Sequence, residues 1–116
     1  MTEYANKERC LDYLAKYAAK DLEGIKAHFA EDIILRDWKI YVEGKEAALR
    51  ETQKNFAAAD TIEISVLSTY ENNDTVAAEL KITVDKTEVL YVVDVVAFTT
   101  EGKIKAIRAY LGRGNA

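Results

Sequence analysis

The feature that most constrains the fold is an apolar run at residues 89–98 that contains a single carboxylate, Asp94. β-Branched and aromatic residues dominate the run, which favours a strand over a helix. Side chains alternate between the two faces of a strand, and here both faces are apolar. Both must be covered, so we expect helices on one face and a second subunit on the other. Asp94 shares its face with Leu90, Val92, Val96 and Phe98, and the opposite face carries Val89, Tyr91, Val93, Val95 and Ala97.

Asp94 is the anomaly in this run. An ionised carboxylate among apolar side chains costs several kcal/mol unless it is paired or protonated, so the fold must neutralise it or use it. One possible partner is Arg108 on the strand that follows. If Glu101-Gly102 forms a two-residue turn, Asp94 and Arg108 point to opposite faces, and Glu-Gly suits such a turn. A three- or five-residue loop would bring Arg108 alongside Asp94.

The composition excludes several classes of protein. A chain of 116 residues with 49% hydrophobic and 31% charged residues fits one globular domain, residues 1–116. The net charge of −4 and the lack of a basic cluster argue against nucleic-acid binding. We find no signal peptide and no apolar run of ~18 residues, so we expect a cytoplasmic protein without membrane contact. A single cysteine, Cys10, excludes an internal disulfide and a cysteine-built zinc site, and we expect no metal or cofactor.

Helical periodicity predicts three helices in the first half of the chain. In residues 2–20 the apolar positions fall at i, i+3, i+4, i+7 and i+8. Asp21 can cap a second, short helix whose buried stripe ends at Phe29, and a short strand at residues 33–38 follows. Gly44 begins a third helix, through about residue 57. The apolar face of the first helix consists of Cys10, Tyr13, Leu14, Tyr17 and Ala18.

From Thr61 onward the hydrophobic period changes to two. We expect strands at residues 61–71, 75–85, 88–99 and 103–111, separated by plausible hairpin turns. Helices followed by antiparallel strands are typical of an α+β domain. The predicted fold is therefore three N-terminal helices packed into the concave face of a curved, mostly antiparallel sheet.

Four short motifs accompany this order of elements. They are Asp21-Leu22-Glu23-Gly24-Ile25, Phe29-Ala30-Glu31-Asp32, Gly44-Lys45-Glu46-Ala47 and the closing segment at residues 94–104. With the order of elements, they resemble the nuclear-transport-factor-2-like superfamily, whose fold is also called the cystatin-like cone. That superfamily contains isomerases, dehydratases, hydrolases, polyketide cyclases and many proteins without a known reaction, so the resemblance implies a fold and not one function.

Within this superfamily the chain is most similar to the ketosteroid isomerases. Tyr13 stands eight residues before Asp21, and Asp37 stands sixteen residues after it. Asp94 lies inside the penultimate strand, as the third functional group of that family does. The resemblance implies that Asp37 is the catalytic base, and that Tyr13 and a protonated Asp94 donate hydrogen bonds to an enolate oxygen, as in that family. One departure is Trp38-Lys39 after Asp37, where the isomerases usually have a proline.

A cone of helices on a curved sheet leaves a cavity with a mostly apolar lining and a few converging polar groups. We expect this cavity to hold a small apolar ketone or a similar hydrophobic ligand. The side chains that we expect to contact the ligand are Tyr17, Trp38, Phe56, Leu90, Val92, Val96, Ile107 and Leu111.

Each candidate residue also has a purely structural interpretation. Asp37 could close a turn at the end of a strand, where aspartate is common. Tyr13 could be a core tyrosine with a satisfied hydroxyl. His28, the single histidine, is most simply a half-buried packing residue, and a role in a dehydratase-like site is the alternative. Cys10 is expected to be a small buried hydrophobe.

The leading functional hypothesis is a dimeric, cofactor-independent isomerase of the ketosteroid-isomerase type, which moves a double bond in an apolar ketone through a dienolate. A second hypothesis is a non-catalytic module that binds a hydrophobic ligand in the same cavity. A third is a dimerisation module with a filled cone, and a further enzyme class is the dehydratase or polyketide-cyclase type. In each case we expect a homodimer through the outer face of the sheet.

Overall fold

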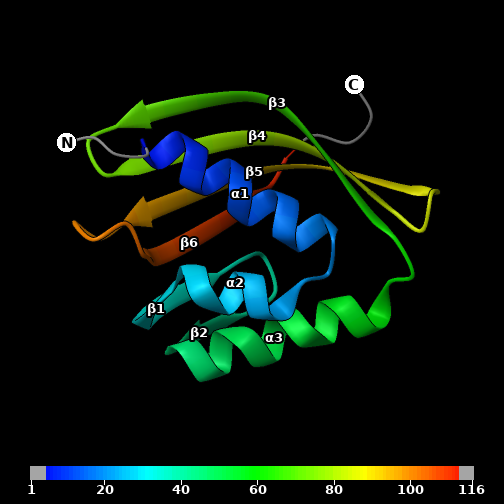
Figure 1. Cartoon of the computed structure of the whole chain (residues 1–116). Helices are drawn as coiled ribbons and strands as arrows, with labels where there is room; N and C mark the ends of the chain where they lie inside the picture. Colours follow the sequence, from blue (N-terminus) through cyan, green and yellow to red (C-terminus); the bar gives the residue numbers. More distant parts are fainter. Residues whose placement is uncertain (1–4, 113–116) are drawn as a thin grey trace.

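The computed structural model describes residues 5–112, which form three helices and six strands (Figure 1). The helices are α1 (Asn6–Ala18), α2 (Leu22–His28) and α3 (Lys45–Ala58). The strands are β1 (Phe29–Arg36), β2 (Tyr41–Glu43), β3 (Ile62–Asn72), β4 (Thr75–Val84), β5 (Glu88–Phe98) and β6 (Ile104–Leu111). We predicted a first helix from residue 2; α1 begins at Asn6, and residues 2–4 lie outside the described part of the chain.

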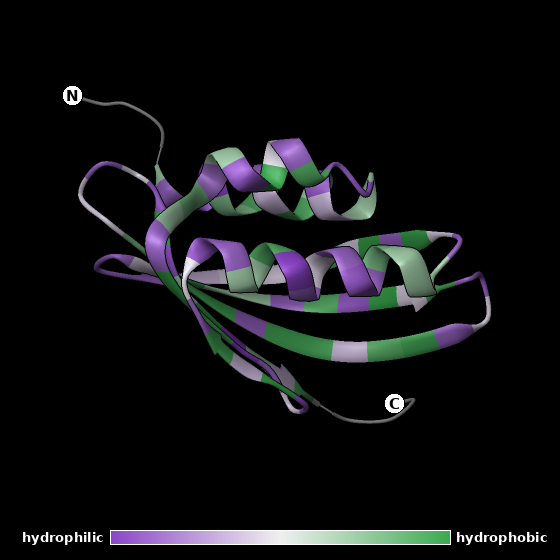
Figure 2. Ribbon diagram, turned by 90° about the horizontal axis from the view of Figure 1, so that it is seen from below, coloured by the Kyte–Doolittle hydropathy of each residue, from purple (hydrophilic) through white to green (hydrophobic). Residues whose placement is uncertain are grey.

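The six strands form one sheet in the order β2-β1-β6-β5-β4-β3. β1 and β6 pair in parallel, and the other four neighbouring pairs are antiparallel. The sheet is curved and carries the helices on one of its faces (Figures 1 and 2). The predicted α+β fold with a curved, mostly antiparallel sheet is therefore confirmed.

The hydrophobic core lies between the helices and the covered face of the sheet. The carboxylate of Asp21 accepts a hydrogen bond from the N–H of Gly24 at 3.0 Å, which caps α2 as predicted. None of the helices in residues 5–112 combines the length and the apolar composition needed to cross a bilayer. The largest side chains that are fully buried in the core are Phe29, Phe98, Ile25, Ile33, Leu80, Ile104 and Ile107.

The boundary between α2 and β1 was predicted wrongly. Phe29, which we placed on the buried stripe of the second helix, is the first residue of β1 and is 1% exposed. It pairs with Ile104 of β6, so its backbone is extended although it stands four residues after Ile25 on α2. Periodicity cannot detect this change, because Phe29 is buried in either conformation.

The sequence analysis also missed β2, a strand of three residues that is too short to show a period. β2 pairs with β1, and Arg36 lies opposite Tyr41 with its guanidinium 4.5 Å from the centre of the tyrosine ring. Asp37 directly follows β1 and opens the β1–β2 turn, one residue beyond the end of the strand, whereas we predicted it at the end of a strand over residues 33–38. Asp37 therefore lies at the end of β1, which is a neighbour of β6 in the sheet.

The pairing of β5 with β6 decides between the two predicted environments of Asp94. Asp94 lies opposite Ala109, and its neighbour Val95 lies opposite Arg108. Asp94 and Arg108 therefore point to opposite faces of the sheet, and Arg108 is exposed. The ion pair between them is excluded, and Asp94 faces the helices.

The β5–β6 hairpin reaches this register by a route that we did not predict. The expected two-residue turn is not formed, because the N–H of Thr99 donates to the carbonyl of Lys103 at 2.7 Å and leaves three residues between them. The register then shifts between Ala97 and Phe98, where β6 carries Lys105 as an extra residue. The longer loop and the β-bulge cancel, so the register at Asp94 is that of a two-residue turn.

Candidate active site

A cavity of about 630 Å³ lies between the helices and the covered face of the sheet. This volume is typical of small-molecule sites, which occupy roughly 300–1,000 Å³. Such a space argues against the filled cone of the third hypothesis. Polar side chains of the lining come from α1, α3, β5 and the β1–β2 turn, and they include Tyr13, Tyr17, Asp37, Thr52, Asn55 and Asp94.

Asp94 lies on the wall of this cavity and is 9% exposed. Its neighbours on the adjacent strands are Ala78 of β4 and Ala109 of β6, whose small side chains leave its carboxyl uncovered toward the cavity. Within residues 5–112 the carboxyl has neither a hydrogen-bond donor nor a basic partner. Burial raises the pKa of Asp94 to about 7, and the negative charge of Asp37 adds to the rise. Near neutral pH the carboxyl can therefore carry a proton and donate it in a hydrogen bond.

Tyr13 of α1 points into the same cavity and is 4% exposed. Its ring lies 6.1 Å from the ring of Phe29, at an angle of 40°, and 6.5 Å from that of His28 in an edge contact. Burial raises the pKa of Tyr13 well above its ordinary value, and the charge of Asp94 raises it further. The phenol therefore stays protonated, and it is a hydrogen-bond donor that lines the same cavity as Asp94.

Asp37 is half-buried at the turn that follows β1 and also lines the cavity. Its Oδ1 accepts hydrogen bonds from the N–H groups of Lys39 at 2.7 Å and Ile40 at 2.9 Å. The structural interpretation of Asp37 as a turn residue is thus correct, and it does not compete with a chemical role. In the described residues no donor binds Oδ2, so one carboxylate oxygen is held by the turn and the other can act on a ligand.

Tyr17 lies one helical turn after Tyr13 on α1, and the two rings are 6.1 Å apart in an edge contact. Its hydroxyl accepts a hydrogen bond from Nδ2 of Asn55 on α3 at 3.0 Å. Burial raises the pKa of Tyr17, and the charges of Asp94 and Asp37 contribute, while the Asn55 hydrogen bond acts in the opposite direction. Our sequence analysis missed Asn55, because no motif links a polar residue of α3 to the first helix.

The sequence model of the SnoaL-like domain family matches residues 11–107, which is most of the chain. The chain belongs to the SnoaL-like domain family. No curated protein matches it in sequence.

Solved structures show that this SnoaL-like domain has the nuclear-transport-factor-2-like, or cystatin, fold. A candidate ketosteroid isomerase from Kribbella flavida is 16% identical, with a TM-score of 0.82 over 96% of this chain and 80% of the other. An epoxide hydrolase of the LEH-like type from M. tuberculosis is 13% identical, with a TM-score of 0.80 over 92% and 82%. A computationally designed 17-OHP binder is 21% identical, with a TM-score of 0.78 over 90% of each chain.

These identities show a shared fold and leave the reaction open. The fold occurs in proteins named as enzymes of different classes and in a designed binding protein. An enzymatic function of the SnoaL-like domain is therefore compatible with its relatives, and the specific chemistry must be argued from its own side chains.

Most of the predicted ligand contacts lie on the cavity of the SnoaL-like domain, and two do not. Phe56 is 5% exposed and packs behind Tyr17, with ring centres 5.1 Å apart, so Tyr17 separates it from the ligand space. Val96 is fully buried two residues after Asp94 on β5 and does not line the cavity. The six predicted residues that line the cavity are Tyr17, Trp38, Leu90, Val92, Ile107 and Leu111.

The wall of the cavity that β3 and β4 form was not predicted, although the sequence contains a signal for it. β3 and β4 alternate apolar and polar residues, and their apolar positions share the face of Asp94. Following this alternation across both strands would have predicted the wall. Its members are Ile62, Ile64, Leu80, Ile82 and Val84.

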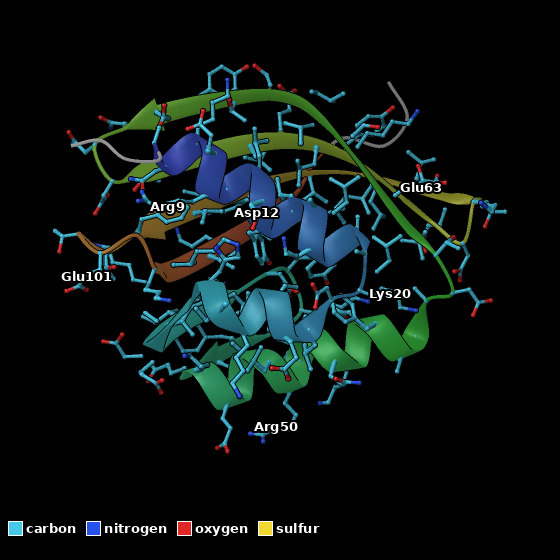
Figure 3. The ribbon with its side chains drawn as sticks, viewed as in Figure 1. Arg9, Asp12, Lys20, Arg50, Glu63 and Glu101 are labelled. Atoms are coloured by element: carbon cyan, nitrogen blue, oxygen red, sulfur yellow. The ribbon has the colours of Figure 1, made fainter. Side chains whose placement is uncertain are left out.

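His28 and Cys10 lie outside the cavity lining. Nε2 of His28 is 2.8 Å from Oδ2 of Asp12, a hydrogen-bond contact between α2 and α1. Asp12 is labelled on α1 in Figure 3. The dehydratase-like role that we considered for His28 gains no support from this position. Cys10 is fully buried, and burial raises the pKa of its thiol to about 12, so it is the small hydrophobe that we expected.

A second hollow of about 540 Å³ lies where α1 begins, beside the β3–β4 and β5–β6 turns. It is an open depression that contains an ion pair between Asp74 and Lys105 at 2.8 Å. None of the candidate residues lines it. Residues 5–112 also contain no group of three or more His, Cys, Asp and Glu side chains that could hold a metal ion.

Proposed function

We propose that this SnoaL-like domain is an isomerase that moves a double bond in an apolar, β,γ-unsaturated ketone. The observation that carries the proposal is the uncompensated carboxyl of Asp94, which faces an apolar cavity beside the Tyr13 hydroxyl, with a second carboxylate, Asp37, at the same cavity. Acid and base chemistry at one pH requires a proton donor and a proton acceptor at the same site, and burial gives Asp94 the raised pKa of a donor.

In the proposed reaction, Oδ2 of Asp37 removes a proton from the carbon between the carbonyl and the double bond. The electron pair of the broken C–H bond moves into the conjugated system, and negative charge develops on the carbonyl oxygen. Asp37 then returns the same proton to the far carbon of the former double bond. The product is the conjugated ketone, with no net change in atoms or oxidation state, and general-base catalysis supplies about 10²–10⁴-fold.

Tyr13 and protonated Asp94 stabilise the dienolate by donating hydrogen bonds to its oxygen. The apolar wall around them excludes water, so each donor can contribute roughly 10²–10³-fold. Asp94 can donate only while it is protonated, and its burial provides this state. Two backbone N–H groups fix Oδ1 of the half-buried Asp37, which leaves Oδ2 to act on the substrate.

The pH dependence of the reaction rate tests the assignment of Asp94 as a proton-bearing donor and Asp37 as the base. Because the donor form of Asp94 is protonated and its pKa is about 7, we expect kcat/KM for a β,γ-unsaturated ketone to fall about tenfold per pH unit above neutrality. The measurement is the absorbance of the conjugated product between pH 5 and 9. In Asp94→Asn, whose amide stays neutral, the alkaline fall should vanish. A profile of the unmutated protein that is flat from pH 6 to 9 would contradict the role of Asp94.

We also propose that the protein is a homodimer through the uncovered face of the sheet. In residues 5–112 all helices lie on the other face (Figure 2). On the uncovered face, the outward side chains of Val93 and Val95 of β5 and Tyr110 of β6 form an apolar strip, and Tyr110 is 54% exposed. The exposed Arg108 borders this strip opposite Val95. An apolar strip of this kind on a soluble protein indicates association.

Val93→Lys should convert the dimer to a monomer, because it puts a charge in the centre of this strip. Leu67→Lys is the matched control, since Leu67 is 47% exposed on the edge strand β3, away from the strip. Sedimentation equilibrium would distinguish the two variants. A monomeric unmutated protein, or a dimer that survives Val93→Lys, would show that this face is not the interface.

A further inference from the structure

A hydrogen bond joins α1 and α3 at the cavity, and the proposed reaction does not use it. Nδ2 of Asn55 donates to the hydroxyl of Tyr17 at 3.0 Å, across 38 positions of sequence. Both residues line the cavity, and Asn55 is exposed at its edge. An exposed hydrogen bond between two helices contributes little to stability, because water could satisfy both groups.

The direction of this hydrogen bond leaves one proton free. A tyrosine hydroxyl has one O–H donor and accepts through its oxygen. The Tyr17 oxygen accepts from Asn55, so its own proton must point elsewhere. Within the described residues the Tyr17 O–H donates to no protein group, and a ligand in the cavity can receive it.

The position of the Tyr17 hydroxyl relative to the two acids shows where such a ligand lies. The charges of both Asp94 and Asp37 act on Tyr17, whereas of these two only Asp94 is a cause of the shift at Tyr13. The edge contact between the two tyrosine rings, 6.1 Å between centres, places Tyr17 directly beside Tyr13. The free O–H of Tyr17 therefore lines the same cavity as the base and the two donors, beside Tyr13, where the reacting part of the substrate must lie.

We infer that Tyr17 is a third hydrogen-bond donor to the charge that develops on the substrate, and that Asn55 is a positioning residue that turns the Tyr17 proton into the cavity. The inference rests on the proposed function, because the charge is that of the dienolate. The inference also gives Asn55 a role. Asn55 lies at the edge of the cavity and acts on the ligand through Tyr17.

Substitutions at both positions test the inference. Tyr17→Phe removes the donor, and we expect kcat to fall about tenfold with KM changed less than about twofold, the signature of an interaction made in the transition state. Asn55→Asp should cause the same loss, because a carboxylate only accepts and would capture the Tyr17 proton. Asn55→Ala should cost less, about threefold, since the hydroxyl is then free to rotate.

Two controls separate this effect from charge and from folding. Gln53→Glu adds the same charge at an exposed position of α3 that does not line the cavity, and it should leave kcat unchanged. In the Tyr17→Phe background, Asn55→Asp should cause no further loss, because no phenolic proton remains to capture. A further loss in that background would mean that the new charge acts directly on Asp37 or Asp94, and would overturn the role of Asn55.

A binding measurement keeps the test independent of turnover. A fluorescent naphthol mimics a dienolate when it ionises, and donors in the cavity lower the apparent pKa of the bound naphthol. Tyr17→Phe and Asn55→Asp should each raise that pKa by about one unit relative to the unmutated protein and to Gln53→Glu. If this shift appears while no ketone is converted, the proposed isomerisation fails, and what remains is that Tyr17, held by Asn55, donates to an anionic oxygen in the cavity. Unchanged naphthol ionisation in both variants, a rise in KM alone, or no naphthol binding would overturn the inference about Tyr17.

Discussion

Asp37→Asn should lower kcat for a β,γ-unsaturated ketone by about a thousandfold, because it removes the carboxylate that carries the proton between two carbons. The substitution keeps the local structure, since the amide oxygen of asparagine can still accept from the N–H groups of Lys39 and Ile40. Binding of an apolar ketone should therefore change little. The rate is measured from the absorbance of the conjugated product, and binding by calorimetry with a saturated ketone that cannot react.

The matched control for this experiment is Asp32→Asn, which changes an exposed aspartate of β1, the strand that precedes Asp37, and Asp32 does not line the cavity. Asp32→Asn should retain full activity. Equal activity in Asp37→Asn would exclude Asp37 as the base. If the unmutated protein binds apolar ketones and converts none of a panel, the function is that of the binding module, a use that the designed 17-OHP binder shows to be compatible with this fold.

The four strands of the second half of the chain were predictable, because apolar residues recur in β3, β4 and β6 at a period near two and β5 is a continuous apolar run between turns. β3, β4, β5 and β6 begin and end within about a residue of their predicted bounds. The errors lie where the local pattern has two solutions. Phe29 is apolar at a position that suits the end of a helix and the start of a strand, and its pairing with Ile104, far along the chain, decides the outcome.

The environment of Asp94 was predicted correctly for a reason that was only partly right. The expected tight turn would have produced the observed register, but the actual loop is longer and the extra residue Lys105 offsets it. Sequence patterns do not reveal such compensation, because a bulge is set by packing of the hairpin as a whole.

The partners of the acids were harder to predict than the acids. The hydrogen bond between Asn55 and Tyr17 depends on how α1 and α3 lie relative to each other, and their sequences do not contain that distance. The same is true of Ala78 and Ala109, whose small side chains keep Asp94 uncovered. The spacing of residues along the chain identified the side chains of Tyr13, Asp37 and Asp94. The shape of the cavity around them depends on long-range packing, which spacing does not reveal.

The burial of Asp94 has a cost in stability that can be measured separately from any reaction. In the folded protein the pKa of Asp94 is about 7, against an ordinary value of 3.8, because burial disfavours its charged form. Below about pH 4 the carboxyl is protonated in both the folded and the unfolded chain and has no effect on their balance. As pH rises from about 4 to 7, the unfolded chain releases this proton while the folded chain keeps it, so the folded state loses stability.

Asp94→Asn should remove this loss. The shift of about three pKa units corresponds to roughly 4 kcal/mol, so the variant should gain about that much relative to the unmutated protein between pH 4 and 8, and the difference should level off above neutrality. Urea unfolding of both proteins at matched concentrations measures it. Carboxyls that do not interact with Asp94 titrate equally in the two chains, so the difference reports the titration of Asp94 together with its coupling to Asp37. A constant cost of burying the amide shifts the curve without changing its slope.

Asp94→Asn should change stability and activity in opposite directions. Asparagine is a weaker donor than a carboxylic acid, so kcat should fall by about a hundredfold at pH 6 while the protein becomes more stable at pH 8. A difference in unfolding free energy that does not depend on pH would show that Asp94 is ionised in the fold at ordinary pH. The carboxyl would then have no proton to donate to a dienolate. Isomerisation would no longer be the function that the side chains of the cavity support best.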